Sequence, residues 1–363
     1  MAEISQNFTA LSSGETDAGS ELRITADRSF DGLRTIVLEN EWLRLVVLPE
    51  AGAKIWQITY RPSSTDLLWN NPEILPARLA AGSCYDDVWS GGWDELFPND
   101  EIAIIDGNTY PDHGELWTGE WGAETFEDAE SVGARLRYTT SGSIQVEKTI
   151  RLRRGYPRIE FHHRFVNQGT AGFPFLWKLH PAMAVSPVHR IDFPKMRVVL
   201  EPAFPGSLAG SGDWGHWPIL ATPLGDVDLR RVSPQEARKL YFFYGTQMEA
   251  GWCAITNTDT ELACGLQFDS SIFRCCWLFA TYGGWRNYNV AVLEPCTGYP
   301  LNFEAMMAAG RQRTLAPGEA LETDVRFLVQ AGLRSVTAID ASGNMMGENS
   351  GVSHRDLRLR VPG

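Results

Sequence analysis

The sequence predicts an all-β fold, a sandwich or a barrel, built as a single large domain. Short β-branched and apolar runs recur from about residue 35 to residue 329, and Gly, Pro, Asn and Asp separate them. Convincing long helices are absent, and many short strands with turn punctuation are typical of sandwiches and barrels. The 363 residues show no composition shift that would mark a boundary, and β-sandwiches can exceed the usual domain size.

The predicted strands follow one another closely along the chain. Ile144–Leu152 alternates polar and apolar residues, as expected of a half-buried strand. His162 and His163 lie in the next strand, on opposite faces because the side-chain period is two. One short helix is predicted at Pro234–Leu240, with Ser233 as its N-cap. The predicted strands are 35–38, 42–48, 55–60, 134–139, 144–152, 158–166, 175–179, 197–200, 240–244, 252–256, 262–268, 290–293 and 321–329.

Three segments differ from this strand pattern. Residues 1–20 are polar and predict a flexible leader, residues 21–334 form the predicted β domain, and residues 335–363 a polar C-terminal tail. The first twenty residues lack the apolar stretch of a signal peptide, and no apolar run approaches ~20 residues. We therefore expect a cytoplasmic protein. The irregular segment 69–121 is rich in aromatic residues, and such long loops are usually functional.

Charge and composition restrict the partners. The net charge is −13, with 45 acidic against 32 basic side chains, which argues against nucleic acid and anionic membranes. Most of the thirteen tryptophans are expected to pack in the core, and a few could stack against the ring of a small-molecule carbohydrate. The six cysteines form no CxxC pair and predict buried free thiols in a reducing compartment. No phosphate-binding glycine motif, GxSxG or HExxH occurs.

Two histidines and a carboxylate are the candidates for chemistry. His113 lies in the aromatic segment between Pro111 and Gly114, which favours a functional role over a surface turn. His180 ends an apolar strand. This position is equally consistent with a side chain that points into a cleft and with a buried histidine whose hydrogen bonds are made within the core. Glu294 follows four apolar residues, so it is either a desolvated general base or a surface carboxylate at a strand exit.

Five further side chains are candidate substrate contacts. Trp93 and Trp117 belong to the tryptophan-rich segment, and Asp94 is a weaker carboxylate candidate beside Trp93. Lys178 lies two residues before His180. Arg286 could bind an anionic substituent, although a surface arginine is as consistent with its position.

The order of several motifs resembles the aldose 1-epimerase (galactose-mutarotase-like) superfamily, over roughly residues 33–330. The matching segments are Asn40–Ile55, Leu67–Trp69, Gly91–Asn99, Pro111–Gly114 with Trp121, Leu176–Pro181, Leu293–Pro295 and Leu315–Glu319. Each motif alone is weak, but their common order is fairly specific. The resemblance implies a galactose-mutarotase-like β-supersandwich.

The resemblance also implies a mechanism that needs no metal or other cofactor. Glu294 would take the proton of the anomeric hydroxyl, His180 would protonate the ring oxygen, and His113 would hydrogen-bond the sugar. Trp117 stands where the hexose-6-phosphate mutarotases carry an arginine. The hydroxyl-binding aspartate of galactose mutarotases has no clear match, and the possible substitutes are Asp213, Asp226 and Asp269.

Two alternatives to an isomerase that interconverts anomers remain open. The same fold could support a metal-assisted lyase or deglycosidase acting on a modified sugar, with a metal held by His113, His180 or His189. A non-catalytic carbohydrate-binding protein is the other, because the segment around Trp89, Trp93, Trp117 and Trp121 would serve binding equally well.

Overall fold

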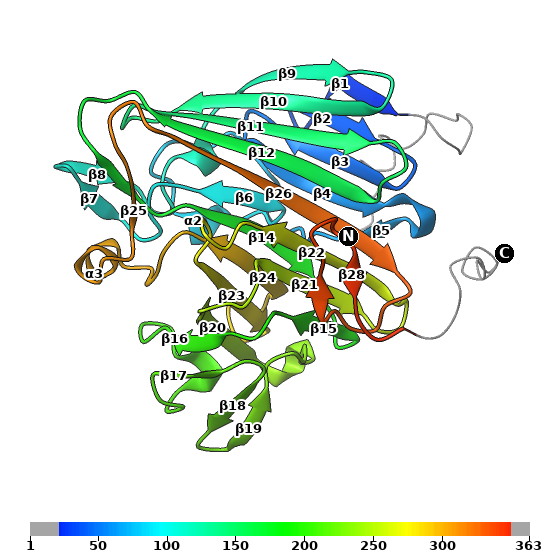
Figure 1. Ribbon diagram of the computed structural model, residues 1–363, viewed down its shortest axis with the longest axis vertical. Coiled ribbons are helices and arrows are strands. Elements are labelled where there is room, and N and C mark those ends of the chain that lie inside the picture. The colour runs from blue at the N-terminus through cyan, green and yellow to red at the C-terminus, as the bar shows by residue number, and fades with distance from the viewer. Residues whose placement is uncertain (1–21, 350–363) are drawn as a thin grey trace.

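The computed structural model describes residues 22–349, and it is dominated by antiparallel strands (Figure 1). The predicted leader 1–20 and residues 350–363 of the predicted tail lie outside the described residues. Two large sheets face each other as layers, with a continuous apolar core between them. The predicted all-β supersandwich is confirmed.

The strands β1–β28 and the helical segments have the following bounds. The strands are β1 Arg23–Phe30, β2 Leu33–Glu39, β3 Leu43–Leu48, β4 Lys54–Tyr60, β5 Thr65–Asp66, β6 Trp93–Leu96, β7 Ala103–Ile105, β8 Asn108–Tyr110, β9 Gly122–Glu127, β10 Ser131–Thr139, β11 Ile144–Arg153, β12 Arg158–Asn167, β13 Phe173–Phe175, β14 Lys178–Ala184, β15 His189–Asp192, β16 Arg197–Leu200, β17 Trp214–His216, β18 Ile219–Thr222, β19 Gly225–Asp228, β20 Lys239–Thr246, β21 Trp252–Asn257, β22 Leu262–Phe268, β23 Cys275–Tyr282, β24 Asn289–Cys296, β25 Arg313–Leu315, β26 Ala320–Ala331, β27 Ala338–Ile339 and β28 Met345–Met346. The helices are α2 Tyr85–Val88 and α3 Phe303–Ala308, and the 3-10 turns are η1 Arg61–Ser63, η2 Leu116–Thr118, η3 Gly206–Leu208 and η4 Gln235–Ala237.

The larger sheet has twelve strands and carries the candidate site. Its order is β1-β2-β3-β4-β6-β14-β24-β23-β20-β16-β17, with β5 paired to β4. Strands far apart in the sequence, β6, β14 and β24, are neighbours at its centre. Residues brought together there come from segments separated by up to two hundred positions.

The smaller sheet has eight strands in the order β15-β21-β22-β26-β12-β11-β10-β9, and it covers one face of the larger one (Figure 1). Burial alternates at every residue of β11 and β12, because one face meets the core and the other meets solvent. The predicted period-2 strand at Ile144–Leu152 is therefore confirmed. Trp93 of the larger sheet packs between Phe161 and Phe327 of the smaller one, at centroid distances of 4.9 and 6.0 Å.

A buried ionic group lies inside this core. Glu95 accepts a hydrogen bond from Trp177 Nε1 at 3.2 Å, and its Oε1 lies 3.1 Å from Lys148 Nζ and 3.0 Å from His163 Nε2. Burial alone would raise the pKa of Glu95, but His163 and Lys148 outweigh it and hold that pKa at about 2. His162 points to the opposite face and contacts Asp324, as the alternation of strand side chains predicts.

Two sequence predictions differ from the structure. The helix expected at Pro234–Leu240 is only the 3-10 turn η4, and it has no side-chain cap. The segment 69–121, expected to be irregular, contains α2 and the central strand β6. Flanking glycines and Pro98 conceal this strand in the sequence, since they normally mark turns.

The remaining global features concern the membrane, the thiols and the tail. Across residues 22–349, no helix is long and apolar enough to cross a membrane. All six cysteines are free thiols, and five of them are buried, Cys84 being exposed. Val336 and Met345, beyond the predicted boundary at residue 334, pack against the smaller sheet.

Candidate active site

The polar floor of the site is a row of side chains across three neighbouring strands. His180 of β14 is paired with Asp94 of β6. The register of β14 with β24 pairs Lys178 with Cys296 and Ala182 with Val292, which places His180 opposite Glu294. Directly opposite residues of antiparallel strands share a face, so all these polar side chains lie on the face turned away from the smaller sheet. His180 and Glu294 are within their strands rather than at the ends that the sequence suggested.

Two segments on either side of β6, residues 84–89 and 100–114, cover this row. The turn at Asp112–Gly114 is fixed because His113 N donates to Asp100 O at 2.6 Å. Gly114 has φ +70°, and a Cβ at this position would overlap the carbonyl group of Phe97. Only glycine therefore fits this close approach, and the turn holds the His113 ring over the sheet.

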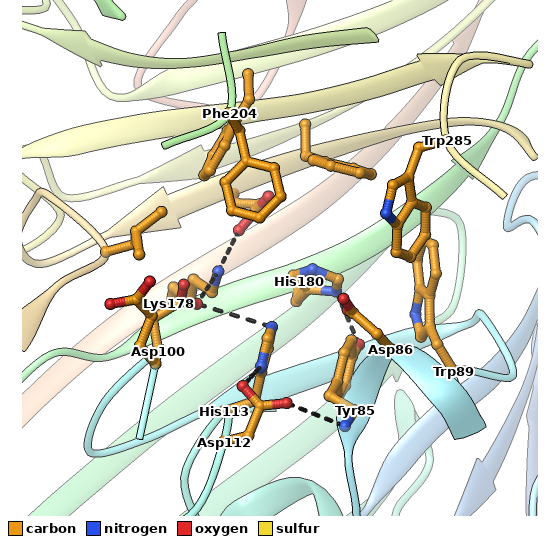
Figure 2. A pocket seen from close by; sticks show the side chains of 15 residues that line it. Tyr85, Asp86, Trp89, Asp100, Asp112, His113, Lys178, His180, Phe204 and Trp285 are labelled. Atoms are coloured by element: carbon orange, nitrogen blue, oxygen red, sulfur yellow. Dashed lines mark hydrogen bonds and ion pairs between the residues drawn. The ribbon is translucent and has the colours of Figure 1, made fainter. Parts of the chain in front are cut away.

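The cavity between the row and the loops measures about 250 Å³. This lies just below the roughly 300–1,000 Å³ typical of sites for drug-sized ligands, which suits a smaller molecule. Trp89 and Trp285 form one wall, with Asp86 beside Trp89, and most of the charged side chains, including Asp100 and Lys178, lie on the opposite side (Figure 2). The lining residues are Tyr85, Asp86, Trp89, Asp100, Glu101, Asp112, His113, Lys178, His180, Phe204, Phe242, Phe279, Trp285, Glu294 and Leu301.

Lys178 lies between two carboxylates and stabilises their charge. Its Nζ is 2.5 Å from Asp100 Oδ1 and 2.8 Å from Glu294 Oε2, and it lies 4.3 Å from the centroid of the Trp277 ring. Burial raises the pKa of Glu294 and the Lys178 charge only partly offsets it, so this carboxylate binds a proton more readily than an exposed glutamate. Burial lowers the pKa of Lys178, but the two carboxylates outweigh it, and the net pKa is raised.

His113 faces carboxylates from both ring nitrogens. Its Nδ1 is 2.9 Å from Asp112 Oδ1, and its Nε2 is 3.8 Å from Asp100 Oδ1. The ring stacks on Tyr85 at a centroid distance of 4.2 Å, with 6° between the planes. Burial would lower the pKa of His113, but the Asp100 charge and the Asp112 hydrogen bond raise it above the usual value.

His180 has a different environment. Its Nδ1 is 3.1 Å from the Tyr85 hydroxyl, which also contacts Asp94 at 2.9 Å. Burial lowers the pKa of His180 well below the usual value, and the charges of Lys178 and His113 lower it further. The two histidine rings are 6.4 Å apart and nearly perpendicular, so both can face one small ligand.

The structure brings some of the sequence candidates together and separates others. The four that line the cavity are His113, His180, Glu294 and Lys178. The four that do not are Trp93, Asp94, Trp117 and Arg286.

Each of the four excluded side chains has another partner. Trp93 packs in the core between the sheets, because strand alternation turns it away from Asp94. Asp94 is 1% exposed and is covered by Tyr85. Trp117 is buried edge-on against the Tyr85 ring, and Arg286 binds Asp87 at 2.7 Å outside the cavity. These residues lack the direct contact with the cavity that the predicted substrate-binding role requires.

Several acidic and aromatic lining residues were not predicted from the sequence. Asp100 directly follows the motif that ends at Asn99, and Asp112 lies in the motif that contains His113. These positions next to or within the family motifs were the one indication in the sequence that both residues could reach the site. The aspartates suggested as hydroxyl-binding groups, Asp213, Asp226 and Asp269, do not line the cavity.

The metal site of the lyase alternative is not assembled from its suggested residues. His189 lies in β15 of the smaller sheet and interacts with Ser186, away from His113 and His180. Within the described part of the chain, no group of three or more His, Cys, Asp or Glu side chains is arranged to hold a metal ion.

Comparison with known proteins relates this architecture to solved structures. No protein-family model matches the chain, and no curated protein matches its sequence. A Klebsiella pneumoniae protein provisionally named an aldose 1-epimerase has a TM-score of 0.65 at 14% identity, over 85% of this chain and 83% of its own. A galactose mutarotase-like protein from Clostridium acetobutylicum has a TM-score of 0.61 at 11% identity, over 86% and 99%. A galactose mutarotase related enzyme from Lactobacillus acidophilus has a TM-score of 0.57 at 15% identity, over 82% and 97%. The resemblance seen in the sequence is thus confirmed at the level of the fold.

Proposed function

We propose that this protein is an aldose 1-epimerase-like enzyme that interconverts the anomers of a neutral aldose by acid–base ring opening. The observation that carries the proposal is the convergence of Glu294, His113 and His180 on one cavity. Acid–base catalysis near neutral pH needs groups with different proton affinities. Here the pKa values of Glu294 and His113 are raised, and the pKa of His180 is lowered.

The proposed reaction needs one proton acceptor and one proton donor. Glu294 takes the proton of the anomeric hydroxyl as the bond between the anomeric carbon and the ring oxygen breaks. An imidazole gives a proton to the ring oxygen, which leaves an open-chain aldehyde. Rotation of the aldehyde and the reverse proton transfers close the ring as the other anomer. Such a general acid–base pair typically contributes ~10²–10⁴-fold for each positioned group.

The lining supports a neutral substrate. Five carboxylates face the cavity, and they are Asp86, Asp100, Glu101, Asp112 and Glu294. Lys178 is the one lysine or arginine among the lining residues, and it is already paired with two of these carboxylates. A phosphate or carboxylate on the sugar would face net repulsion. The aromatic wall offers flat apolar surfaces to a pyranose ring.

Exchange NMR on a panel of unphosphorylated aldoses tests this proposal. The wild-type protein should accelerate exchange between the α and β anomer signals of at least one aldose above its spontaneous rate. If no aldose on the panel exchanges faster than in buffer alone, the proposal is wrong.

A carbohydrate-binding protein without catalysis is the second candidate, favoured by the aromatic wall of Trp89 and Trp285. Calorimetry with the same panel separates the two. Binding without accelerated exchange would support this candidate, and binding with exchange would support the enzyme.

A further inference from the structure

A buried chain of polar contacts runs along the cavity face of the larger sheet, from Lys54 of β4 to His180. Lys54 Nζ contacts Asp94 Oδ2 at 2.6 Å and also donates to Gly91 O at 2.8 Å. The Tyr85 hydroxyl lies 2.9 Å from the same Asp94 oxygen and 3.1 Å from His180 Nδ1. None of these side chains is more than 6% exposed, so their hydrogen bonds must be made to one another, to neighbouring backbone or to a ligand in the cavity.

The directions of these hydrogen bonds follow from what each group can donate. A lysine ammonium only donates and a carboxylate only accepts, so Lys54 donates to Asp94. The Tyr85 hydroxyl has one hydrogen, and burial together with Asp94 raises the pKa of Tyr85 well above its usual value, so the hydrogen stays on the phenol. That hydrogen points to Asp94. The phenol oxygen must then accept a hydrogen bond from His180 Nδ1–H.

This arrangement selects one tautomer of His180. A neutral imidazole carries one proton, and here Nδ1 holds it. Nε2 is left with a lone pair. In this state His180 accepts a hydrogen bond from a ligand in the cavity.

His113 has the opposite environment. Its Nδ1 faces Asp112, whose other oxygen accepts a hydrogen bond from Tyr85 N at 3.0 Å, and its Nε2 faces Asp100. The other charged or titratable groups that line the same cavity are Asp86 and Tyr85 of α2, Glu101 next to Asp100, Lys178 and His180 of β14, and Glu294 of β24. The carboxylates outnumber the cations, which favours an imidazolium that donates from Nδ1 to Asp112 and keeps its Nε2 proton for a ligand in the cavity.

We infer that His113 gives the proton to the ring oxygen, and that His180 accepts a hydrogen bond from a sugar hydroxyl. The inference rests on the proposed function and exchanges the two histidine roles that the family resemblance implies. During ring opening, the His113 Nε2 proton goes to the ring oxygen, the anomeric hydroxyl proton goes to Glu294, and both return on closure. Tyr85 and Asp94 are positioning residues that fix the His180 tautomer.

The first test is the protonation state of each ring, read by ¹⁵N NMR of protein labelled at histidine. His180 should show a protonated Nδ1 and an unprotonated Nε2 at pH 7, and His113 should show both nitrogens protonated in most molecules at pH 6.5. Tyr85→Phe should release the His180 tautomer, whereas Tyr138→Phe, which changes a half-buried tyrosine outside the cavity, should leave it unchanged. A His180 ring protonated at Nε2 in the wild type would overturn the inference.

The second test is kinetic and uses the same substitution at both sites. His113→Gln should lower the exchange rate ~10²–10⁴-fold, because glutamine cannot supply the proton. His180→Gln keeps an acceptor oxygen and should lower it less than about tenfold. An equal or larger loss in His180→Gln would overturn the inference.

The pH profile gives an independent readout. If His113 is the donor, the alkaline limb of the rate should titrate above pH 6.5, and Asp112→Asn should move that limb to lower pH. A limb that does not move in Asp112→Asn would contradict the inference. Absence of anomer exchange in the wild type would reject the proposed function, while the NMR tautomers would still decide which nitrogen donates.

Discussion

Lys178→Met isolates the charge that keeps Glu294 available as a base. At 2.8 Å and an effective dielectric constant of about 20, one contact of Lys178 with a carboxylate is worth about 6 kcal/mol before desolvation. Removing one partner of a buried pair typically costs about 3–5 kcal/mol, because the remaining charge is left uncompensated. We therefore expect the free energy of unfolding to fall by about 3–5 kcal/mol at pH 7.

The loss should depend on pH with a definite sign. Burial raises the pKa of Glu294 and Lys178 opposes this, so removal of the lysine raises that pKa further. A carboxyl group with a raised pKa in the folded state contributes stability below its ordinary pKa and loses it as the pH rises. In urea unfolding, the loss of unfolding free energy in Lys178→Met relative to the wild type should accordingly be smaller near pH 4.5 than at pH 7. The acid limb of the exchange rate should also move to higher pH.

Lys148→Met is the matched control. Lys148 is equally buried and lies 3.1 Å from Glu95 Oε1, but in the core rather than on the cavity. It should cost similar stability at pH 7 and leave the acid limb of the rate unmoved. The reasoning is refuted if Lys178→Met leaves that limb in place, or if Lys148→Met moves it equally.

Three further outcomes follow from the cavity and its loops. Trp285→Ala removes part of the aromatic wall and should weaken sugar binding about tenfold by calorimetry, and an unchanged affinity would exclude stacking there. A hexose 6-phosphate should bind at least about tenfold more weakly than the same free hexose, because the lining is acidic, and tighter binding would contradict that electrostatic argument. Gly114→Ala should cost about 1–3 kcal/mol in urea unfolding from its positive φ alone, with more from overlap with Phe97, and a neutral change would show that the turn can rearrange.

The fold was predictable because its signal is local. Alternation along β11 and β12 follows directly from one face being buried, so each strand can be recognised without knowledge of its partners. Strand β6 was not predictable in the same way. Four consecutive buried residues between turn-forming glycines and a proline show no alternation, because loops cover the face opposite the core.

The site was predictable in part. His113, His180 and Glu294 occupy positions where motif order carried information, and the structure places all three on one cavity. Asp100 reaches that cavity from a loop and Tyr85 from the short helix α2, and no spacing in the sequence encodes either position. Trp93 and Asp94 are adjacent in a strand and point to opposite faces, so at most one of them could face the site. Asp94 is on the side of the site, but Tyr85 covers it.

The most direct test of the account is the anomer exchange rate of Glu294→Gln beside the wild type, measured by exchange NMR on a neutral aldose that the wild type converts. Glutamine preserves the size of the side chain and removes its ability to take a proton. The account predicts a loss of ~10²–10⁴-fold with the folded structure retained. A Glu294→Gln protein that exchanges anomers at the wild-type rate would contradict it.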